Sequence, residues 1–279
     1  MKASANANPQ SWLQRSPVSS LQLIVLLSCC LAARATGATL PSLSPLDQTA
    51  TSAERQPVLV ELFTSEGCSD CPPADEVLAR LDASQFVPGA QAIVLSEHVT
   101  YWNHLGWSDP YSLEEMTQRQ SRYVSRFHLD SAYTPQAVVD GVAQMVGSDQ
   151  AALSHAIATA AQTIKPYLRI EGAAWNANTI GFAVKAPQGL QGVLNVALAE
   201  DATSSAVGRG ENAGRTLHHV AVVRLMKTMG RNKANGEPLT LQTGTVKIPA
   251  GKVFRLVAFL TDEENGRVLA AAEVRIARP

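Results

Sequence analysis

The stretch VLVELFTSEGCSDCPPAD, residues 58–75, decides how this chain begins to fold. Its first part, residues 58–64, is mostly apolar with Glu61 near its centre, and a short run of this kind predicts a buried strand. After the motif, apolar residues recur at the spacing of one helix face, namely Ala74, Val77, Leu78 and Leu81. The two cysteines of the Cys-Ser-Asp-Cys motif, Cys68 and Cys71, are therefore expected where a strand passes into a helix.

The following residues continue this alternation up to about residue 165. Two strand–helix units followed by a hairpin and a last helix predict an α/β domain over 57–165, with helices covering both faces of its sheet. The further predicted strands are 92–96, 136–139 and 142–146, and the further predicted helices are 112–128 and 148–164.

The pattern changes at Pro166, beyond which no long amphipathic helix is evident. Alternation of apolar and polar residues predicts strands instead, and the sequence favours an all-β, sandwich-like domain over 166–279. The predicted strands of this domain are 168–175, 179–186, 193–199, 219–225, 239–248, 253–261 and 268–276.

The N-terminal residues are expected to direct export of the chain and not to be part of its fold. Residues 1–35 combine early positive charges, a short apolar run and small residues at a cleavage position, which is the layout of a secretory signal peptide. Residues 36–56, rich in Ser, Pro, Thr and Ala, are predicted to be a flexible linker. We therefore expect a periplasmic or secreted protein. The alternatives are an uncleaved signal anchor and lipid attachment at Cys29.

The cysteine content and the charge of the chain restrict the classes of function that the sequence allows. The chain has four cysteines, Cys29, Cys30, Cys68 and Cys71, so removal of the signal leaves only the motif pair. An exported protein that keeps two closely spaced cysteines is expected to use them together. Lys plus Arg number 23 against 24 Asp plus Glu, which gives no electrostatic case for nucleic acid or an anionic membrane surface. Membrane contact is expected only through the signal peptide or a lipid anchor.

Several stretches together resemble one bacterial family. They are the motif segment 60–75, His98 with Tyr101-Trp102, and the segments 106–110, 133–136 and 210–217. From about Gln56 to the C-terminus the chain is similar to exported thioredoxin-like proteins that are known only as a domain of unknown function. The resemblance implies an α/β thioredoxin-like N-terminal domain before the all-β domain. Glu97 departs from the family pattern, in which an aromatic residue is expected.

The resemblance also implies roles for three residues around the motif. In the thioredoxin fold a cis-proline preceded by a threonine-like residue faces the cysteine pair, and Pro135 with Thr134 matches that position. An acid on the strand before the motif lies beneath the cysteines and passes protons to the second one, and Glu61 matches it. The alternatives are a trans-proline in an ordinary turn and a glutamate held in a salt bridge.

The cysteine pair itself carries the expected chemistry. Cysteines at i and i+3 at a helix start lie close enough for a disulfide. Cys68 would gain thiolate character from the helix N-terminus and attack, and Cys71 would resolve a mixed disulfide. Asp70 between them opposes the thiolate by its charge. The alternatives are an inert structural disulfide and a pair that binds a soft metal.

Three aromatic or imidazole side chains in the segment after residue 96 are weaker candidates. Tyr101 and Trp102 are expected either to line a substrate pocket or to pack in the core. His98 is expected either to pack or to act as a proton carrier or metal ligand.

These observations favour a thiol–disulfide oxidoreductase that acts on protein thiols or disulfides without a cofactor. Its predicted catalytic residues are Cys68, Cys71, Pro135 and Glu61, with Thr134, Tyr101 and Trp102 binding substrate. One alternative is a copper-binding or copper-delivery protein that uses Cys68, Cys71 and His98. A second is a non-catalytic scaffold with a structural disulfide.

Overall fold

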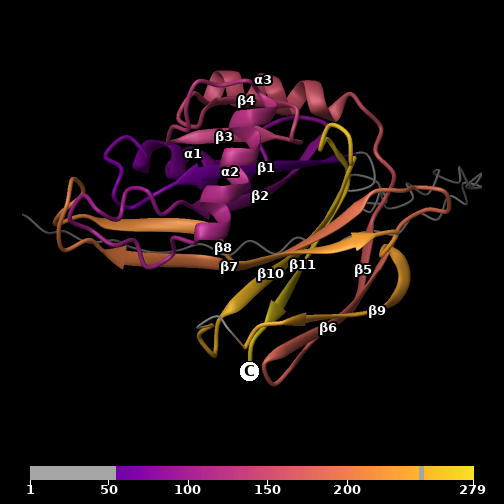
Figure 1. Cartoon of the computed structure of the whole chain (residues 1–279). Coiled ribbons are helices and arrows are strands. Elements are labelled where there is room, and N and C mark those ends of the chain that lie inside the picture. Colours follow the sequence, from indigo (N-terminus) through magenta and orange to yellow (C-terminus); the bar gives the residue numbers. More distant parts are fainter. Residues whose placement is uncertain (1–54, 245–247) are drawn as a thin grey trace, which may run out of the picture. The chain divides into compact units, whose positions relative to one another are not determined.

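Strands from both halves of the chain join one mixed sheet in the computed structural model (Figure 1). The structure describes residues 55–244 and 248–279. The predicted signal peptide, Cys29 and nearly all of the predicted linker lie outside these residues. The described residues belong to one unit that spans 47–279.

The large sheet has eight strands in the order β11-β10-β7-β8-β2-β1-β3-β4. β1 runs parallel to β2, and β2 is joined in parallel to β8 through the pair Ser96 and Val222. The other neighbours pair antiparallel. The strands are β1 (Gln56–Thr64), β2 (Ala90–His98), β3 (Gln136–Val139), β4 (Ala143–Val146), β7 (Val193–Ala206), β8 (Thr216–Arg231), β10 (Val253–Thr261) and β11 (Val268–Ala277).

Three helices in the described part of the chain accompany β1 to β4. They are α1 (Pro72–Ser84), α2 (Glu114–Arg126) and α3 (Gln150–Ala161). Adjacent side chains of β1 point to opposite faces of the sheet. Leu62 borders Gly147 together with Ala74 of α1, whereas Glu61 binds Arg119 of α2. The two helices therefore lie on opposite faces of β1.

A second, smaller sheet has the order β5-β6-β9, formed by β5 (Arg169–Asn176), β6 (Thr179–Lys185) and β9 (Asn235–Gln242). Its apolar residues, such as Ile180 and Phe182, share a core with Leu198 and Phe254 of the large sheet. A separate core joins residues from both halves of the chain, including Val60, Leu95, Val223 and Phe259.

The predicted fold class is wrong. The molecule is mostly β-structure around a large mixed sheet, not an α/β thioredoxin-like domain followed by a β-sandwich. The motif strand and helix form as expected in β1 and α1, but β8 lies along β2 and extends the first sheet into the second half of the chain. Residue alternation identifies the two faces of a strand but not its neighbours, and here the neighbours decide the architecture.

A buried arginine ties α1 to the C-terminal strands. Arg255 of β10 is 2% exposed, and its terminal nitrogens donate to the Asp82 carboxylate at 2.5 and 2.7 Å. Its Nε donates to Asp201 at 2.5 Å. The guanidinium is thus held between carboxylates from different parts of the chain.

We predict that Arg255→Met lowers the free energy of unfolding by about 2 kcal/mol, because it removes the buried guanidinium that binds the partly buried Asp82 and Asp201 carboxylates. Urea unfolding of the purified chain measures the change. Arg275→Met is the matched control, since Arg275 is 55% exposed and shares only Asp201, at 3.2 Å. It should cost under about 1 kcal/mol. Equal losses in the two variants would contradict the prediction.

Candidate functional site

The two motif cysteines form a disulfide at the start of α1. Their Cα atoms lie 5.4 Å apart, and Cys71 is the N-cap of the helix. The Cys71 carbonyl oxygen accepts hydrogen bonds from the backbone N–H groups of Ala74 and Asp75. Prolines fill the first helical positions, where a missing N–H costs little. The sequence therefore folds this segment as a disulfide-closed turn that leads directly into a helix.

The predicted Thr134–Pro135 segment lies beside the disulfide. The peptide bond between the two residues is cis, as expected from the resemblance. The carbonyl oxygen of Thr134 lies 3.9 Å from Cys68 Sγ. Trp102 Nε1 donates to Thr134 Oγ1 at 2.8 Å, so this indole is anchored next to the motif.

Trp102 also packs closely against the motif backbone. A Cβ placed on Gly67 would lie 3.0 Å from the Trp102 Cβ, so only glycine leaves room for the tryptophan there. The Tyr101 hydroxyl donates to Gln120 of α2 at 3.1 Å and also interacts with the Thr134 side chain. Both predicted substrate-binding aromatics therefore contact Thr134, and Trp102 also packs against the motif backbone.

A loop from the second half of the chain covers the motif. We call residues 207–215, which connect β7 to β8, the cover loop. Asn212 Nδ2 donates to the carbonyl oxygens of Glu66 and Cys68, both at 2.9 Å. The Ser69 N–H donates to Glu211 Oε2 at 3.0 Å. Under this loop Cys68 is 1% exposed and Cys71 0%, so the disulfide is closed off from solvent.

Beside the motif lies a buried cluster that joins its two flanks. His219 of β8 lies with Nε2 3.2 Å from Glu66 Oε1 and with Nδ1 3.6 Å from Asp75 Oδ2. Burial alone would lower the pKa of His219, but the Asp75 and Glu66 carboxylates outweigh it and raise this pKa to about 10. His219 is therefore a buried cation between the residue just before the motif and the first turn of α1.

His98 belongs to the same cluster, and its imidazole contacts the carboxylate of Asp109. Its Nδ1 lies 2.7 Å from Asp109 Oδ2, and its ring meets the His219 ring edge to face at 4.7 Å between centroids. Burial alone would raise the pKa of Asp109, but His98 and the backbone N–H groups of Glu66 and Tyr111 lower this pKa to about 2. The arrangement fixes the imidazole and points Nδ1 at the carboxylate.

Metal binding at Cys68, Cys71 and His98 stays a prediction. Within 55–244 and 248–279, no group of three or more His, Cys, Asp or Glu side chains is arranged to hold a metal ion. In the disulfide form the two sulfurs are bonded to each other, so they offer no thiolate ligands.

Glu61 lies on the other face of β1, where it binds α2. Its carboxylate accepts from Arg119 Nε and from the Tyr123 hydroxyl, each at 2.5 Å. Burial alone would raise the pKa of Glu61, but the Arg119 guanidinium outweighs it and holds this pKa below its ordinary value. Glu61 is thus an ion-paired carboxylate, as in the salt-bridge alternative, and no described hydrogen bond or ion pair joins it to either cysteine.

The pKa of the neighbouring residue Glu97 is shifted in the opposite direction. Its side chain is fully buried, and burial together with the charge of Glu61 raises the pKa of Glu97 well above its ordinary value. Arg119 Nε lies 3.6 Å from its Oε2. The carboxyl group that replaces the expected aromatic residue therefore belongs to the Glu61–Arg119 network rather than to the disulfide.

Sequence reasoning missed the His219 cluster and the contact of Asn212 with the motif. Both residues lie more than 140 positions after the motif, in segments that were expected to form another domain. The one available signal was the glycine-flanked polar segment around Asn212, which the family resemblance had singled out.

The chain is similar to one protein family and to several solved structures. Residues 59–260 match a family described as a protein of unknown function, DUF1223. No curated protein matches the chain. The crystal structure of protein AGR_C_4864 from Agrobacterium tumefaciens is similar with 23% identity and a TM-score of 0.60, covering 79% of this chain and 95% of that one. This likeness shows that the two proteins share a fold.

Two other solved structures are similar only in part. A β-glucuronidase from Ruminococcus gnavus covers 40% of this chain and 16% of its own at 9% identity and a TM-score of 0.22. A DUF3823 family protein from Bacteroides ovatus covers 41% of this chain and 57% of its own at 11% identity and a TM-score of 0.25. Among the described residues, no helix has the length and apolar character that crossing a membrane requires.

The charge of His219 predicts a pH dependence of stability. Because its pKa in the folded protein is about 10 and lies above the unfolded value, its stabilisation is full below the unfolded pKa and is lost as pH rises through 10. From pH 7 to 10, unfolding free energy should fall up to about 1.4 kcal/mol per pH unit more steeply than in His219→Gln.

Urea unfolding across this pH range measures the difference. His155→Gln, which changes an exposed histidine of α3, is the matched control and should retain the wild-type slope. Parallel pH profiles for wild type and His219→Gln would show that His219 is not the buried cation described.

Proposed function

The chain belongs to DUF1223, a family of proteins of unknown function, and we propose that its Cys68–Cys71 pair carries out thiol–disulfide exchange with partner proteins. The observation that carries the proposal is a disulfide at the N-terminus of α1 with the Thr134 carbonyl oxygen 3.9 Å from Cys68 Sγ. A helix N-terminus favours a thiolate, which is the reactive form in exchange. The proposal rests on this local chemistry and not on the fold class.

The exchange needs no cofactor. In the reducing direction, the Cys68 thiolate attacks one sulfur of a partner disulfide, and the other partner sulfur leaves as a thiolate. The Cys71 thiolate then attacks the Cys68 sulfur, which releases the second partner thiolate and re-forms the Cys68–Cys71 disulfide. Two electrons pass to the partner, whose thiolates take up the two protons that the cysteines gave up. The reverse sequence oxidises a partner dithiol.

Access to the disulfide is the main physical requirement. Both cysteines are buried and the cover loop binds the motif backbone, so we propose that a partner sulfur reaches Cys68 after this loop moves. Asn212 holds the loop through two hydrogen bonds to the motif backbone, at Glu66 and Cys68. We therefore propose that release of Asn212 opens the site.

Export supports this use of the pair. If residues 1–35 are removed as a signal peptide, Cys68 and Cys71 are the two remaining cysteines of the chain. The periplasm or the cell exterior supplies protein thiols and disulfides as partners. The direction of electron flow then follows from the reduction potential of the pair relative to its partner.

A second candidate is a structural disulfide that staples the start of α1 in a non-catalytic scaffold. The burial of both sulfurs favours it, because inert disulfides are typically inaccessible. The two functions differ in reduction potential. Structural disulfides in secreted proteins lie below about −300 mV, whereas exchange-active pairs lie above that value.

We predict that the purified chain reduces insulin disulfides in the presence of dithiothreitol and that Cys68→Ser lowers the rate at least about 100-fold, because the attacking sulfur is lost. Ser121→Ala is the matched control, since Ser121 is exposed on α2 and lies outside the motif and the cover loop. It should retain the rate within about twofold.

The reduction potential, measured against glutathione, completes the test. A potential below about −300 mV together with no insulin turnover would overturn the exchange function and assign the structural role. Turnover that survives in Cys68→Ser would also overturn it, because the activity would then lie elsewhere.

The cover loop generates a further prediction. Asn212→Ala removes two hydrogen bonds that hold the loop closed, each worth about 1 kcal/mol, so the open form should gain at least about tenfold. The rate at which dithiothreitol reduces the disulfide should rise by the same factor, as measured by trapping free thiols over time.

Asn176→Ala, at the exposed end of β5, serves as the control and should leave this rate unchanged. An unchanged rate in Asn212→Ala would mean that the loop does not limit access to the disulfide.

A further inference from the structure

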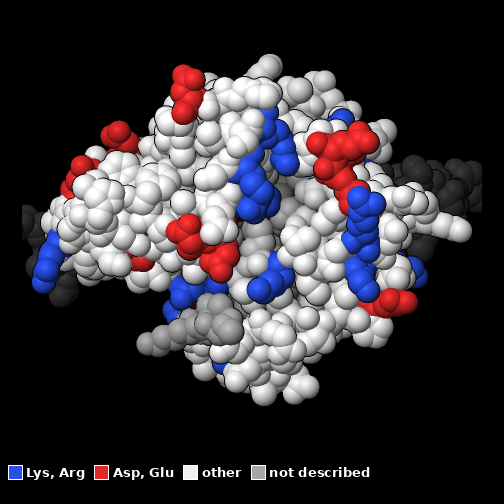
Figure 2. Space-filling view, viewed as in Figure 1, with Lys and Arg blue, Asp and Glu red and all other residues white. Residues whose placement is uncertain are grey.

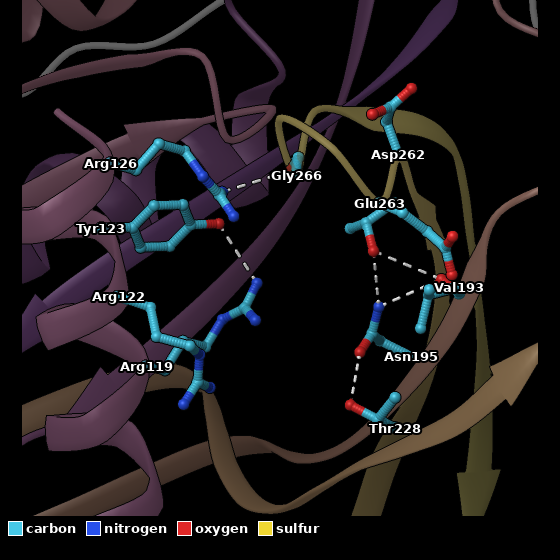
Figure 3. Close-up of a pocket in the computed structure, with 11 residues that line it drawn as sticks. Arg119, Arg122, Tyr123, Arg126, Val193, Asn195, Thr228, Asp262, Glu263 and Gly266 are labelled. Carbon is cyan, nitrogen blue, oxygen red and sulfur yellow. Dashed lines mark hydrogen bonds between the residues drawn. The ribbon is translucent and has the colours of Figure 1, made fainter.

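A cavity of about 360 Å³ lies between α2 and the turn that joins β10 to β11, away from the disulfide. Figure 2 shows basic side chains gathered along a groove in the centre of this face, with acidic side chains on the other side of it. Figure 3 shows the lining residues, with Arg119, Arg122, Tyr123 and Arg126 on one wall and Asn195, Thr228 and Asp262 across from them. The volume falls within the range of small-molecule pockets, roughly 300–1,000 Å³.

The basic wall comes from one face of α2. Arg119, Arg122 and Arg126 follow each other at three and four positions, the spacing that brings helical side chains to one face. Arg119 is neutralised by Glu61 at 2.5 Å. Neither Arg122 nor Arg126 forms an ion pair with any described carboxylate. Two guanidinium groups that have no ion-pair partner among the described residues therefore border the cavity.

The contacts of Arg126 fix the position of its guanidinium group but do not neutralise the positive charge. Its guanidinium carbon lies 5.3 Å from the Tyr123 ring centroid, and its Nη1 donates to the Gly266 carbonyl oxygen at 3.5 Å (Figure 3). Burial and the neighbouring Arg119 charge lower the pKa of Arg122. A bound anion would offset the mutual repulsion of these charges.

The carboxylates of the opposite wall already have partners. Glu263 forms a salt bridge with Arg231. Asp262 Oδ1 accepts from the backbone N–H groups of Glu264 and Asn265 at 2.9 and 3.1 Å. Glu263 is thus paired with β8 and Asp262 with its own turn, and neither forms an ion pair with the guanidinium groups of α2.

The floor of the cavity is polar and ordered. Asn195 Nδ2 donates to Val193 O at 3.2 Å and to Thr261 Oγ1 at 3.1 Å. Thr228 Oγ1 donates to Asn195 Oδ1 at 2.9 Å. These bonds fix side chains from β7, β8 and β10 at one end of the cavity, opposite the arginines.

We propose that this cavity is a binding site for a small oxyanion, in which Arg122 and Arg126 bind a carboxylate or phosphate group. Guanidinium groups suit such ligands because their N–H donors match two oxygens at once. The facing acids make the site selective for small ligands, since a bulky polyanion would meet Asp262 and Glu263 on the far wall. The inference does not depend on disulfide exchange.

Calorimetric titration of the full chain at low ionic strength tests the proposal, with inorganic phosphate and acetate as separate probes. We expect one-to-one binding of at least one probe, and the tighter one assigns the head group. The double variant Arg122→Gln/Arg126→Gln should weaken this binding at least about tenfold, because each charge-assisted hydrogen bond it removes is strong. Added sodium chloride should also weaken it.

The double variant Arg80→Gln/Arg169→Gln is the charge-matched control, since both arginines are exposed and neither lines the cavity. It should retain affinity within about twofold. Absence of heat with both probes up to about 10 mM would overturn the proposal. Equal weakening in both double variants would also overturn it, because the binding would then depend on net charge and not on this cavity.

Discussion

The pairing of β8 with β2 is the interaction on which the rest of this structure depends. It occurs at Ser96 and Val222, in the middle of a sheet whose two halves come from opposite ends of the chain. Because β7 and β8 form one long hairpin, the pairing carries the cover loop onto the motif. It also brings His219 between Glu66 and Asp75. The cover of the disulfide and the buried cation beside it are therefore consequences of one strand contact.

Several buried charges of the molecule are stabilised by partners from distant segments. Arg255 meets Asp82 of α1, and Glu61 meets Arg119 of α2. Removing one partner from such a pair is costly, because the remaining charge stays buried. The same rule explains why the motif lies against His219: the carboxylates beside the cysteines have a buried cation as a partner. The unpaired Arg122 and Arg126 stand apart from this pattern in the described chain, which is why they indicate a ligand.

The two candidate sites of the molecule have different physical characters. The disulfide is enclosed, and its chemistry depends on movement of a loop held by Asn212. The arginine cavity is open to solvent and has an ordered floor, so it is available without rearrangement. One lies at the start of α1 and the other along α2, and the two sites share no lining residue. Loss of one function should therefore leave the other intact.

The sequence by itself determined the local features: the strand before the motif, the helix after it, and the pairing of Cys68 with Cys71. The position of Pro135 beside the pair followed from the family resemblance. These succeed because apolar spacing and short-range geometry are encoded within a few residues. Only the tertiary structure decided that Glu61 binds α2 and that Asn212 covers the motif. Those outcomes depend on which strands become neighbours, and residue alternation marks the faces of a strand without naming the strand beside it.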